Sequence, residues 1–171
     1  NALVGAGLKS EVRLAASGKV TSGASIAINA ALGADWCNAA RAFMFSLGCI
    51  QSLKCHTGTC PTGIATQSPA RQRGLVVPEK AERVARFHGS TLKALHEIIG
   101  AAGLDSPSDL RPSHLRQRIN VAEMKQLDEI YAFARPGEMV AGSENAQLRR
   151  WWEAADPDTF RRVDGDRLAP A

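Results

Sequence analysis

The sequence predicts a mixed α/β fold. Two short strand–helix units follow one another in the first third of the chain, and consecutive units of this kind run their strands in parallel. A long amphipathic helix comes later. Of the 171 residues, 44% are apolar and 22% are charged, which is the usage of a folded protein. The length suits one domain, and no apolar run reaches the ~18 residues of a membrane span.

The two units are delimited by short-range signals. Residues 11–16 have the apolar content of a short buried strand, and Ser22 is a good N-cap for a helix that Gly33 ends. Residues 34–38 are short enough for a second strand, and residues 39–47 have the composition of a second helix. We therefore expect two parallel strands, each followed by a helix.

The rest of the chain divides into a loop and several helices. Residues 49–67 are rich in Gly, Thr, Pro and Cys and have neither structural period, which indicates an ordered loop. Apolar residues at 3.6-residue spacing predict a long helix over 78–103. Shorter helices are expected over residues 105–118, 121–133 and 144–155, the last with Trp151 and Trp152 packed on its own domain, followed by a loose tail after Asp156. The predicted domains are residues 1–75 and 76–171.

The charge is unevenly distributed. The chain has a net charge of +4, and residues 1–75 hold 7 Lys and Arg against 2 acidic residues. This half therefore favours an anion, such as the phosphate of a cofactor, an acidic substrate or a nucleic acid. Because only 5% of residues are aromatic, a base-stacking surface is disfavoured, and a bound phosphate is the simplest partner.

Two turns that follow the predicted strands could bind that phosphate. Ser17, Gly18 and Lys19 come after the first strand, where a glycine lets backbone N–H groups approach an anion at a helix N-terminus. Arg41 follows the second strand and could contact a phosphate in a bidentate manner. Alone, the first turn is more often an ordinary βα turn, because Ser, Gly and Thr are common in such turns, and Arg41 is as easily a surface arginine. Together they gain weight, since adjacent strand ends of a parallel barrel meet at one site.

Three of the four cysteines fall within twelve residues. Cys49, Cys55 and Cys60 are followed by Pro61, and Cys-Pro often ends a run of iron–sulfur ligands. Zinc, with His56 as a fourth ligand, and unligated core thiols are the alternatives. Cys37 stands apart in the second predicted strand and is expected to be a small buried side chain. His88, His96 and His114 have no spaced partner and are expected to be structural or solvated. With no secretory leader in the sequence, we expect thiols and a cytoplasmic protein, and attachment to a membrane through an upstream segment is left open.

Several motifs resemble the end of the FMN-binding domain of glutamate synthases, and most closely the single-chain group of that family. They are LGAD at 32–35, LGCIQ at 47–51 and CHTGTCPTGIATQ at 55–67, and the helix over 78–103 with LRPSHL at 110–115 adds to them. The resemblance implies a (β/α)8 barrel that holds FMN at the C-terminal ends of its strands. This chain would supply the last two strand–helix units, an iron–sulfur loop and a C-terminal helical extension.

The resemblance also implies the ligands. The FMN phosphate would contact Ser17, Gly18, Lys19, Asn38, Ala39, Ala40 and Arg41, and Cys49, Cys55 and Cys60 would hold a 3Fe-4S cluster. The implied reaction is FMN-dependent reduction of 2-iminoglutarate, formed from 2-oxoglutarate and ammonia or glutamine nitrogen, to L-glutamate. A donor such as ferredoxin or a reductase would supply electrons. No catalytic residue is assigned, because these residues would belong to upstream strands. The alternative is a non-enzymatic zinc-binding interaction module that uses the same cysteines.

Overall fold

The computed structural model describes residues 1–159. Its contacts divide the chain into two units, Leu14–Arg116 and a second unit that joins Asn1–Arg13 to the chain from Gln117 onward. The predicted division at residue 75 falls inside the first of these units and stays a prediction. Within the described residues, no helix is both long and apolar enough to cross a membrane.

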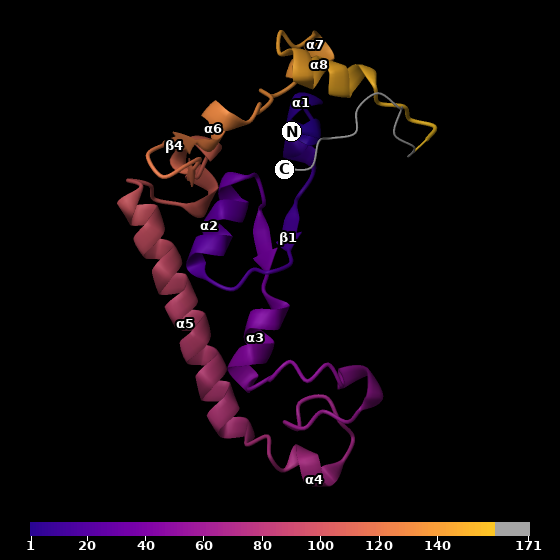
Figure 1. Ribbon diagram of the computed structural model, residues 1–171, viewed down its shortest axis with the longest axis vertical. Helices are drawn as coiled ribbons and strands as arrows, with labels where there is room; N and C mark the ends of the chain where they lie inside the picture. Colours follow the sequence, from indigo (N-terminus) through magenta and orange to yellow (C-terminus); the bar gives the residue numbers. More distant parts are fainter. Residues whose placement is uncertain (160–171) are drawn as a thin grey trace. The chain divides into compact units, whose positions relative to one another are not determined.

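The unit Leu14–Arg116 opens with two strand–helix pairs (Figure 1). Strand β1 (Ala15–Ser17) precedes α2 (Gly23–Ala31), and β2 (Trp36–Asn38) precedes α3 (Ala40–Leu47). The two strands pair in parallel, so the predicted strand–helix units and their direction are confirmed. The first strand begins later than predicted and is not buried, because a sheet of two three-residue strands leaves its outer positions exposed.

Helix α5 (Val77–Ala101) packs against α2 and carries the hydrophobic core of this unit. The core cluster consists of Ala27, Ala31, Leu95, Ile99 and Leu110. The small face of α2 lets the two helices approach closely, and its Gly23 lies against the α5 backbone at Leu95. The alanines and glycine of α2 are therefore positioned by packing as well as by helix propensity.

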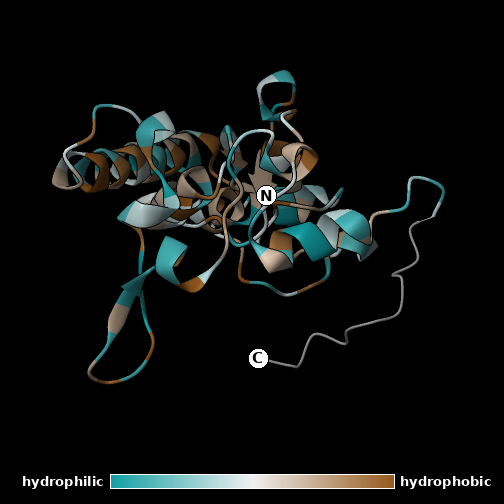
Figure 2. Ribbon diagram, turned by 90° about the horizontal axis from the view of Figure 1, so that it is seen from above, coloured by the Kyte–Doolittle hydropathy of each residue, from teal (hydrophilic) through white to brown (hydrophobic). Residues whose placement is uncertain are grey.

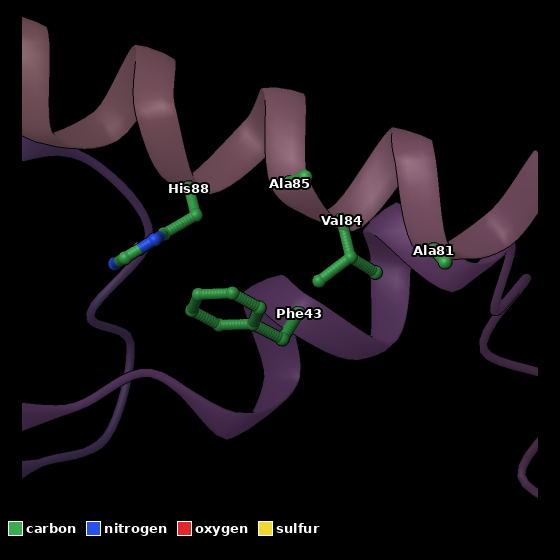
Figure 3. Close-up of a pocket in the computed structure, with 5 residues that line it drawn as sticks. All are labelled: Phe43, Ala81, Val84, Ala85 and His88. Atoms are coloured by element: carbon green, nitrogen blue, oxygen red, sulfur yellow. The ribbon is translucent and has the colours of Figure 1, made fainter.

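A second contact of α5 is with α3. Phe43 of α3 meets Phe87 of α5 edge to face, with ring centroids 5.3 Å apart, and its ring also lies 5.9 Å from the His88 ring. Figure 3 shows Phe43 directed toward α5, beside Val84 and His88. Aromatic pairs of this geometry stabilise a contact by about 0.5–1.5 kcal/mol beyond the area they bury.

The segment between α3 and α5 is a loop with short local structure, as predicted. It contains a 3-10 turn, η2 (Cys55–Thr57), a bridge between Thr59 and Thr66, and the short helix α4 (Pro69–Gln72). Gln72 fastens α4 to the loop, because its Nε2 donates to the carbonyl of Thr66 at 2.9 Å.

The prediction of helices over residues 105–118 and 121–133 is wrong. The chain there forms two 3-10 turns, a two-stranded sheet and one helical turn: η3 (Pro107–Asp109), η4 (Pro112–His114), β3 (Arg116–Arg118), β4 (Met124–Gln126) and α6 (Leu127–Ile130). Proline lacks the N–H that would continue a helix, so Pro107 and Pro112 each begin a new turn. The Asn120 side chain accepts the Ala122 N–H at 2.9 Å and closes the turn between the strands.

In the other unit, the first residues of the chain bind the C-terminal extension. Asn1 donates to the Ala132 carbonyl at 2.7 Å and accepts from the Ala134 N–H at 2.9 Å. Helix α1 (Ala2–Gly5) contacts α7 (Glu138–Ala141), where Gly5 lies against Met139. These contacts link segments that are more than 130 residues apart in the sequence.

The last described helix is α8 (Ala146–Glu153), which confirms the helix predicted near residues 144–155. Asn145 caps it by accepting the Gln147 and Leu148 N–H groups. Leu148 is the buried residue of α8. Trp151 and Trp152, which were expected to pack on their own domain, are 44% and 41% exposed. Most of the tail predicted to be loose lies outside the described residues.

Coloured by hydropathy, the ribbon shows apolar and polar residues alternating along the helices (Figure 2).

Candidate functional site

The turn after β1 has an unusual backbone. Ser17 ends the strand, and Gly18 and Lys19 both take left-handed conformations, with φ of 94° and 55°. This conformation is costly for a lysine and is common at binding sites, where the surrounding structure holds it. Val20, only 3% exposed, anchors the turn, while the Lys19 side chain is exposed to solvent.

Helix α2 follows this turn and has a complete cap of its own. The Ser25 N–H donates to Ser22 Oγ, and Ser25 Oγ in return accepts the N–H groups of Thr21 and Ser22, each at 3.0 Å. The cap fixes where α2 begins, directly after the Lys19 turn. The positive end of the helix dipole is thus placed beside a lysine.

Helix α3 begins differently after β2. Its N-cap residue, Ala39, provides no side-chain hydrogen bond, so the first N–H groups of α3 lack a side-chain partner within the described chain. Arg41 lies in the first turn, is exposed and forms no ion pair among the described residues. An uncapped helix N-terminus beside an unpaired arginine is suited to an anion.

The structure brings these two turns together. In the parallel pairing of β1 and β2, Ser17 is the register partner of Asn38. The two strands therefore end side by side, and the Gly18–Lys19 turn and the start of α3 leave the sheet at the same edge. All seven residues predicted to contact a phosphate, Ser17, Gly18, Lys19, Asn38, Ala39, Ala40 and Arg41, lie at this edge.

The cysteine loop begins at the end of α3. Gly48, with φ of 104°, ends the helix, and the Cys49 N–H donates to the Met44 carbonyl at 3.0 Å. Between Cys49 and Cys55, Gln51 and Leu53 have φ near 55°, which is a strained conformation for both. The loop is therefore held in a specific path although it contains little regular structure.

Cys60 lies between Thr59 and Thr66, which form an antiparallel bridge, and is 6% exposed. The Thr62 hydroxyl, 3.3 Å from Sγ, and then the Ala65 N–H, with smaller effects of the Thr62 and Ile64 N–H groups, lower the pKa of Cys60 to about 7. These donors outweigh the effect of burial, which acts in the opposite direction. The turn thus favours a thiolate, the form that binds metal.

Gly63 makes this turn possible. Its φ is 80°, and a Cβ at this position would collide with the backbone carbonyl of Arg71 in α4. Only glycine meets both requirements. The α4 segment consequently supports the turn that surrounds Cys60.

The donor types fit a metal cluster, although the thiols are not gathered. All four cysteines are free, and Cys49 is half-buried, Cys55 exposed and Cys60 buried. Within residues 1–159, no three His, Cys, Asp or Glu side chains lie close enough together to hold one metal ion. A single metal ion would therefore require the thiols to move closer together, as in sites that order on binding their metal.

The remaining candidate residues have structural surroundings. Cys37 is half-buried rather than buried, and desolvation raises the pKa of its thiol. His114 lies in a 3-10 turn instead of the predicted helix, where its Nδ1 accepts the Arg111 N–H at 3.0 Å. His88 packs on Phe43, and His96 is exposed.

The sequence reading missed Lys80 and Arg83 of α5. A Cβ placed on Gly48 would lie 3.5 Å from Lys80 Nζ and 4.0 Å from Arg83 Nη1, so both cations lie at the start of the cysteine loop. Nothing in the local sequence indicates this proximity, because it depends on how α5 packs against α3.

Fold and site define an α/β protein in which two strand–turn–helix units present basic turns at one edge, next to a thiol-rich loop. The family described as "Conserved region in glutamate synthase" matches residues 1–105, and the chain belongs to the glutamate synthase family of oxidoreductases. The family resemblance of the motifs is thereby confirmed.

Three relatives illustrate the similarity. The glutamate synthase large subunit-like protein YerD of Bacillus subtilis is 41% identical over 72% of this chain and 24% of its own length. The archaeal glutamate synthase [NADPH] of Methanocaldococcus jannaschii is 36% identical over 71% of this chain and 24% of its own. The ferredoxin-dependent glutamate synthase of Pyropia yezoensis is 32% identical over 57% of this chain and 6% of its own. The chain thus spans about a quarter of the length of the first two.

Proposed function

We propose that this chain forms the closing part of an FMN-dependent, glutamate synthase-like oxidoreductase. In this proposal β1–α2 and β2–α3 are the last two units of a (β/α)8 barrel, and the cysteine loop and the segment from α5 onward follow the barrel. Membership of the family, the parallel pairing of β1 with β2 and the short span relative to the relatives all support it. Phosphate sites of such barrels characteristically lie after the last two strands.

The observation that carries the proposal is the register pairing of Ser17 with Asn38. It aligns the two turns, so that Lys19 and Arg41 can neutralise one phosphate from two sides. The N–H groups at Gly18 and at the uncapped start of α3, Ala39 and Ala40, would donate to its oxygens. The remaining contacts would come from Ser17 and Asn38.

Cys49, Cys55 and Cys60 would hold the 3Fe-4S cluster. Thiolate is the ligand that iron–sulfur clusters use, and the donors around Cys60 favour the thiolate. When bound, FMN supplies hydride to 2-iminoglutarate, formed from 2-oxoglutarate and ammonia, and the cluster supplies electrons to the flavin. The names of the NADPH and ferredoxin-dependent relatives support a ferredoxin or a reductase as the donor, and glutamine is the other candidate nitrogen source.

The phosphate site is tested in the complete protein with Lys19→Ala and Arg41→Ala. Each substitution should weaken FMN retention by about 1–3 kcal/mol, the contribution of a hydrogen bond to a charged group. Arg86→Ala is the matched control, because Arg86 is an exposed cation on α5 that pairs with Glu82. The measurement is FMN affinity by calorimetry. Unchanged affinity in both variants would remove these residues from the site.

The cluster is tested by chemical analysis of the anaerobically purified complete protein. Iron with acid-labile sulfide, and an electron paramagnetic resonance signal of an oxidised 3Fe-4S cluster, are expected. Zinc without sulfide would replace the electron-relay proposal by the metal-binding interaction module.

A further inference from the structure

Helix α5 carries two cations of unusual placement. Lys80 and Arg83 are three residues apart and therefore lie on one face of α5. Their side-chain nitrogens lie 3.5 Å and 4.0 Å from the position of a Cβ on Gly48. Gly48 ends α3, and Cys49 follows it directly.

These two cations lack an acidic partner. Within residues 1–159, no ion pair joins Lys80 or Arg83 to a carboxylate, although Glu79 and Glu82 lie nearby in the sequence. The other cations of the same helix behave differently, since Arg86 pairs with Glu82 and Lys93 with Glu97. Lys80 is also half-buried, which is unusual for an unpaired lysine.

The surrounding sequence does not neutralise them either. Residues 36–78, which include all of α3 and the cysteine loop, contain no aspartate or glutamate. The C-terminus of α3 carries the negative end of the helix dipole, and α3 has no basic residue in its own last turn. The cations of α5 therefore act on the point where α3 ends and the loop begins.

Helix α5 packs against α3 close to this point. Phe43 and Phe87 pack edge to face one to two turns away, and the hollow between α3 and α5 is lined by Val84, Ala85 and His88 (Figure 3). Lys80 and Arg83 are consequently held at the loop by the packing of the two helices.

We propose that Lys80 and Arg83 are positioning residues that set the reduction potential of the cluster bound by Cys49, Cys55 and Cys60. The inference rests on the proposed function. Reduction adds one electron to a cluster that its thiolate ligands already make negative. Fixed positive charge nearby stabilises the reduced form more than the oxidised form. The two cations thus make the cluster a better acceptor of electrons from the donor.

The test is a potentiometric titration of the complete protein with dithionite, which supplies the electron, followed by electron paramagnetic resonance of the oxidised cluster. Lys80→Met and Arg83→Met remove charge while keeping side-chain length. Each should lower the equilibrium constant for reduction by roughly threefold and the pair by about tenfold. For a one-electron couple, a tenfold change equals about 59 mV.

The controls separate charge from structure. Lys93 lies about 20 Å along α5 from Lys80, so Lys93→Met should leave the potential of the cluster unchanged. Lys80→Arg keeps the charge and should keep the wild-type potential. Thermal unfolding of each variant reports any loss of the α3–α5 contact, which could change the potential through solvent exposure and must therefore be absent for a shift to be assigned to charge.

The outcomes distinguish this inference from the proposed function. Absence of a cluster from the wild-type protein would contradict the proposed function. A cluster with an unchanged potential in the Lys80→Met/Arg83→Met protein would overturn the inference alone. If the Lys80→Met/Arg83→Met protein loses its cluster, the same titration is made on Lys80→Arg/Arg83→Lys, which keeps both charges. Retention at the wild-type potential supports the inference, and loss there too would contradict it.

Discussion

Cys60 differs from the other cysteines because the surrounding turn is built for an anionic sulfur. The Thr62 hydroxyl and the Ala65 N–H both point to Sγ, whereas desolvation alone governs Cys37. N–H groups directed at a sulfur stabilise a thiolate whether it is bare or bound to iron. These surroundings therefore distinguish Cys60 from Cys37.

Substitution of serine for Cys60 in the complete protein should therefore degrade the cluster, because a hard hydroxyl is a poor substitute for a soft thiolate. Cys37→Ser should spare it and is the matched control. The measurement is iron and sulfide content with the paramagnetic signal of the oxidised cluster. A Cys60→Ser protein with full iron content and an unaltered signal would refute the ligand assignment.

Glu138, at the start of α7, connects Arg135, which precedes the helix, with Ser143, which follows it. The Arg135 N–H, the Ser143 hydroxyl and the Arg135 charge lower the pKa of this carboxyl below its usual range. A carboxyl with a depressed folded pKa contributes stability above its unfolded pKa and loses it as the pH falls through the folded value. The contribution should thus be present at neutral pH and disappear in acid.

Amide hydrogen exchange of Arg135 and Asn145 in the complete protein should reveal this effect. Both amides belong to the network, since Asn145 N–H donates to Ser143 Oγ. Glu138→Gln should speed their exchange at neutral pH and have little additional effect below the folded pKa. Equal protection in both proteins across the pH range would show that the charge of Glu138 contributes nothing.

The sequence predicted which residues make up the candidate site, but not the hydrogen bonds and neighbouring charges that surround them. The spacing of Cys49, Cys55 and Cys60 is visible in the sequence, as are the basic residues Lys19 and Arg41. The hydrogen bonds at Cys60 arise from a turn that depends on Gly63 and α4, and no periodicity encodes such a contact. Lys80 and Arg83 could not be singled out because their position beside Gly48 depends on how α5 packs against α3.

At the scale of elements, the sequence predicted a helix correctly where one local signal, such as a cap or a regular apolar spacing, was strong. The Ser22 cap and Gly33 delimit α2, and the 3.6-residue apolar spacing identifies α5. They failed over residues 105–133, where composition is compatible with helix but Pro107, Pro112 and Asn120 favour turns. Turn chemistry outweighed helix propensity in this region.

The packing of α2 on α5 depends on Gly23. A Cβ there would lie 2.5 Å from Leu95 N and 2.8 Å from Ala94 C, both of them backbone atoms of α5. Gly23→Ala should therefore push the helices apart and lower the free energy of unfolding by about 1–3 kcal/mol, as overpacking does. The measurement is chemical unfolding of the complete protein.

Gly89→Ala is the matched control for this prediction. Gly89 lies within α5, where an added Cβ meets nothing within 4 Å. Alanine should stabilise the helix there by about 0.5–1 kcal/mol, because glycine has the lower helix propensity. Equal stability changes for Gly23→Ala and Gly89→Ala would contradict the close packing of α2 on α5.

At the scale of the whole molecule, the small β1–β2 sheet limits how much of a cofactor this chain could bind alone. It has two parallel strands of three residues each, and Trp36 within it is 49% exposed. All-parallel sheets are normally covered on both faces, and open strand edges are normally paired. The sequence predicted the two strands, but their further neighbours could be expected only from the family resemblance.

The isolated 171-residue chain should therefore bind FMN poorly. Its two turns offer contacts to the phosphate alone. Binding through the phosphate would leave the large apolar flavin ring in water, so the ring would have to be held by residues outside this chain. Calorimetry of FMN with the isolated chain should detect no binding at micromolar concentrations, whereas the complete protein should retain the cofactor through gel filtration. Micromolar affinity of the isolated chain that is lost in Lys19→Ala would contradict the barrel proposal. It would mean that β1, β2 and their turns form a sufficient flavin site without further strands.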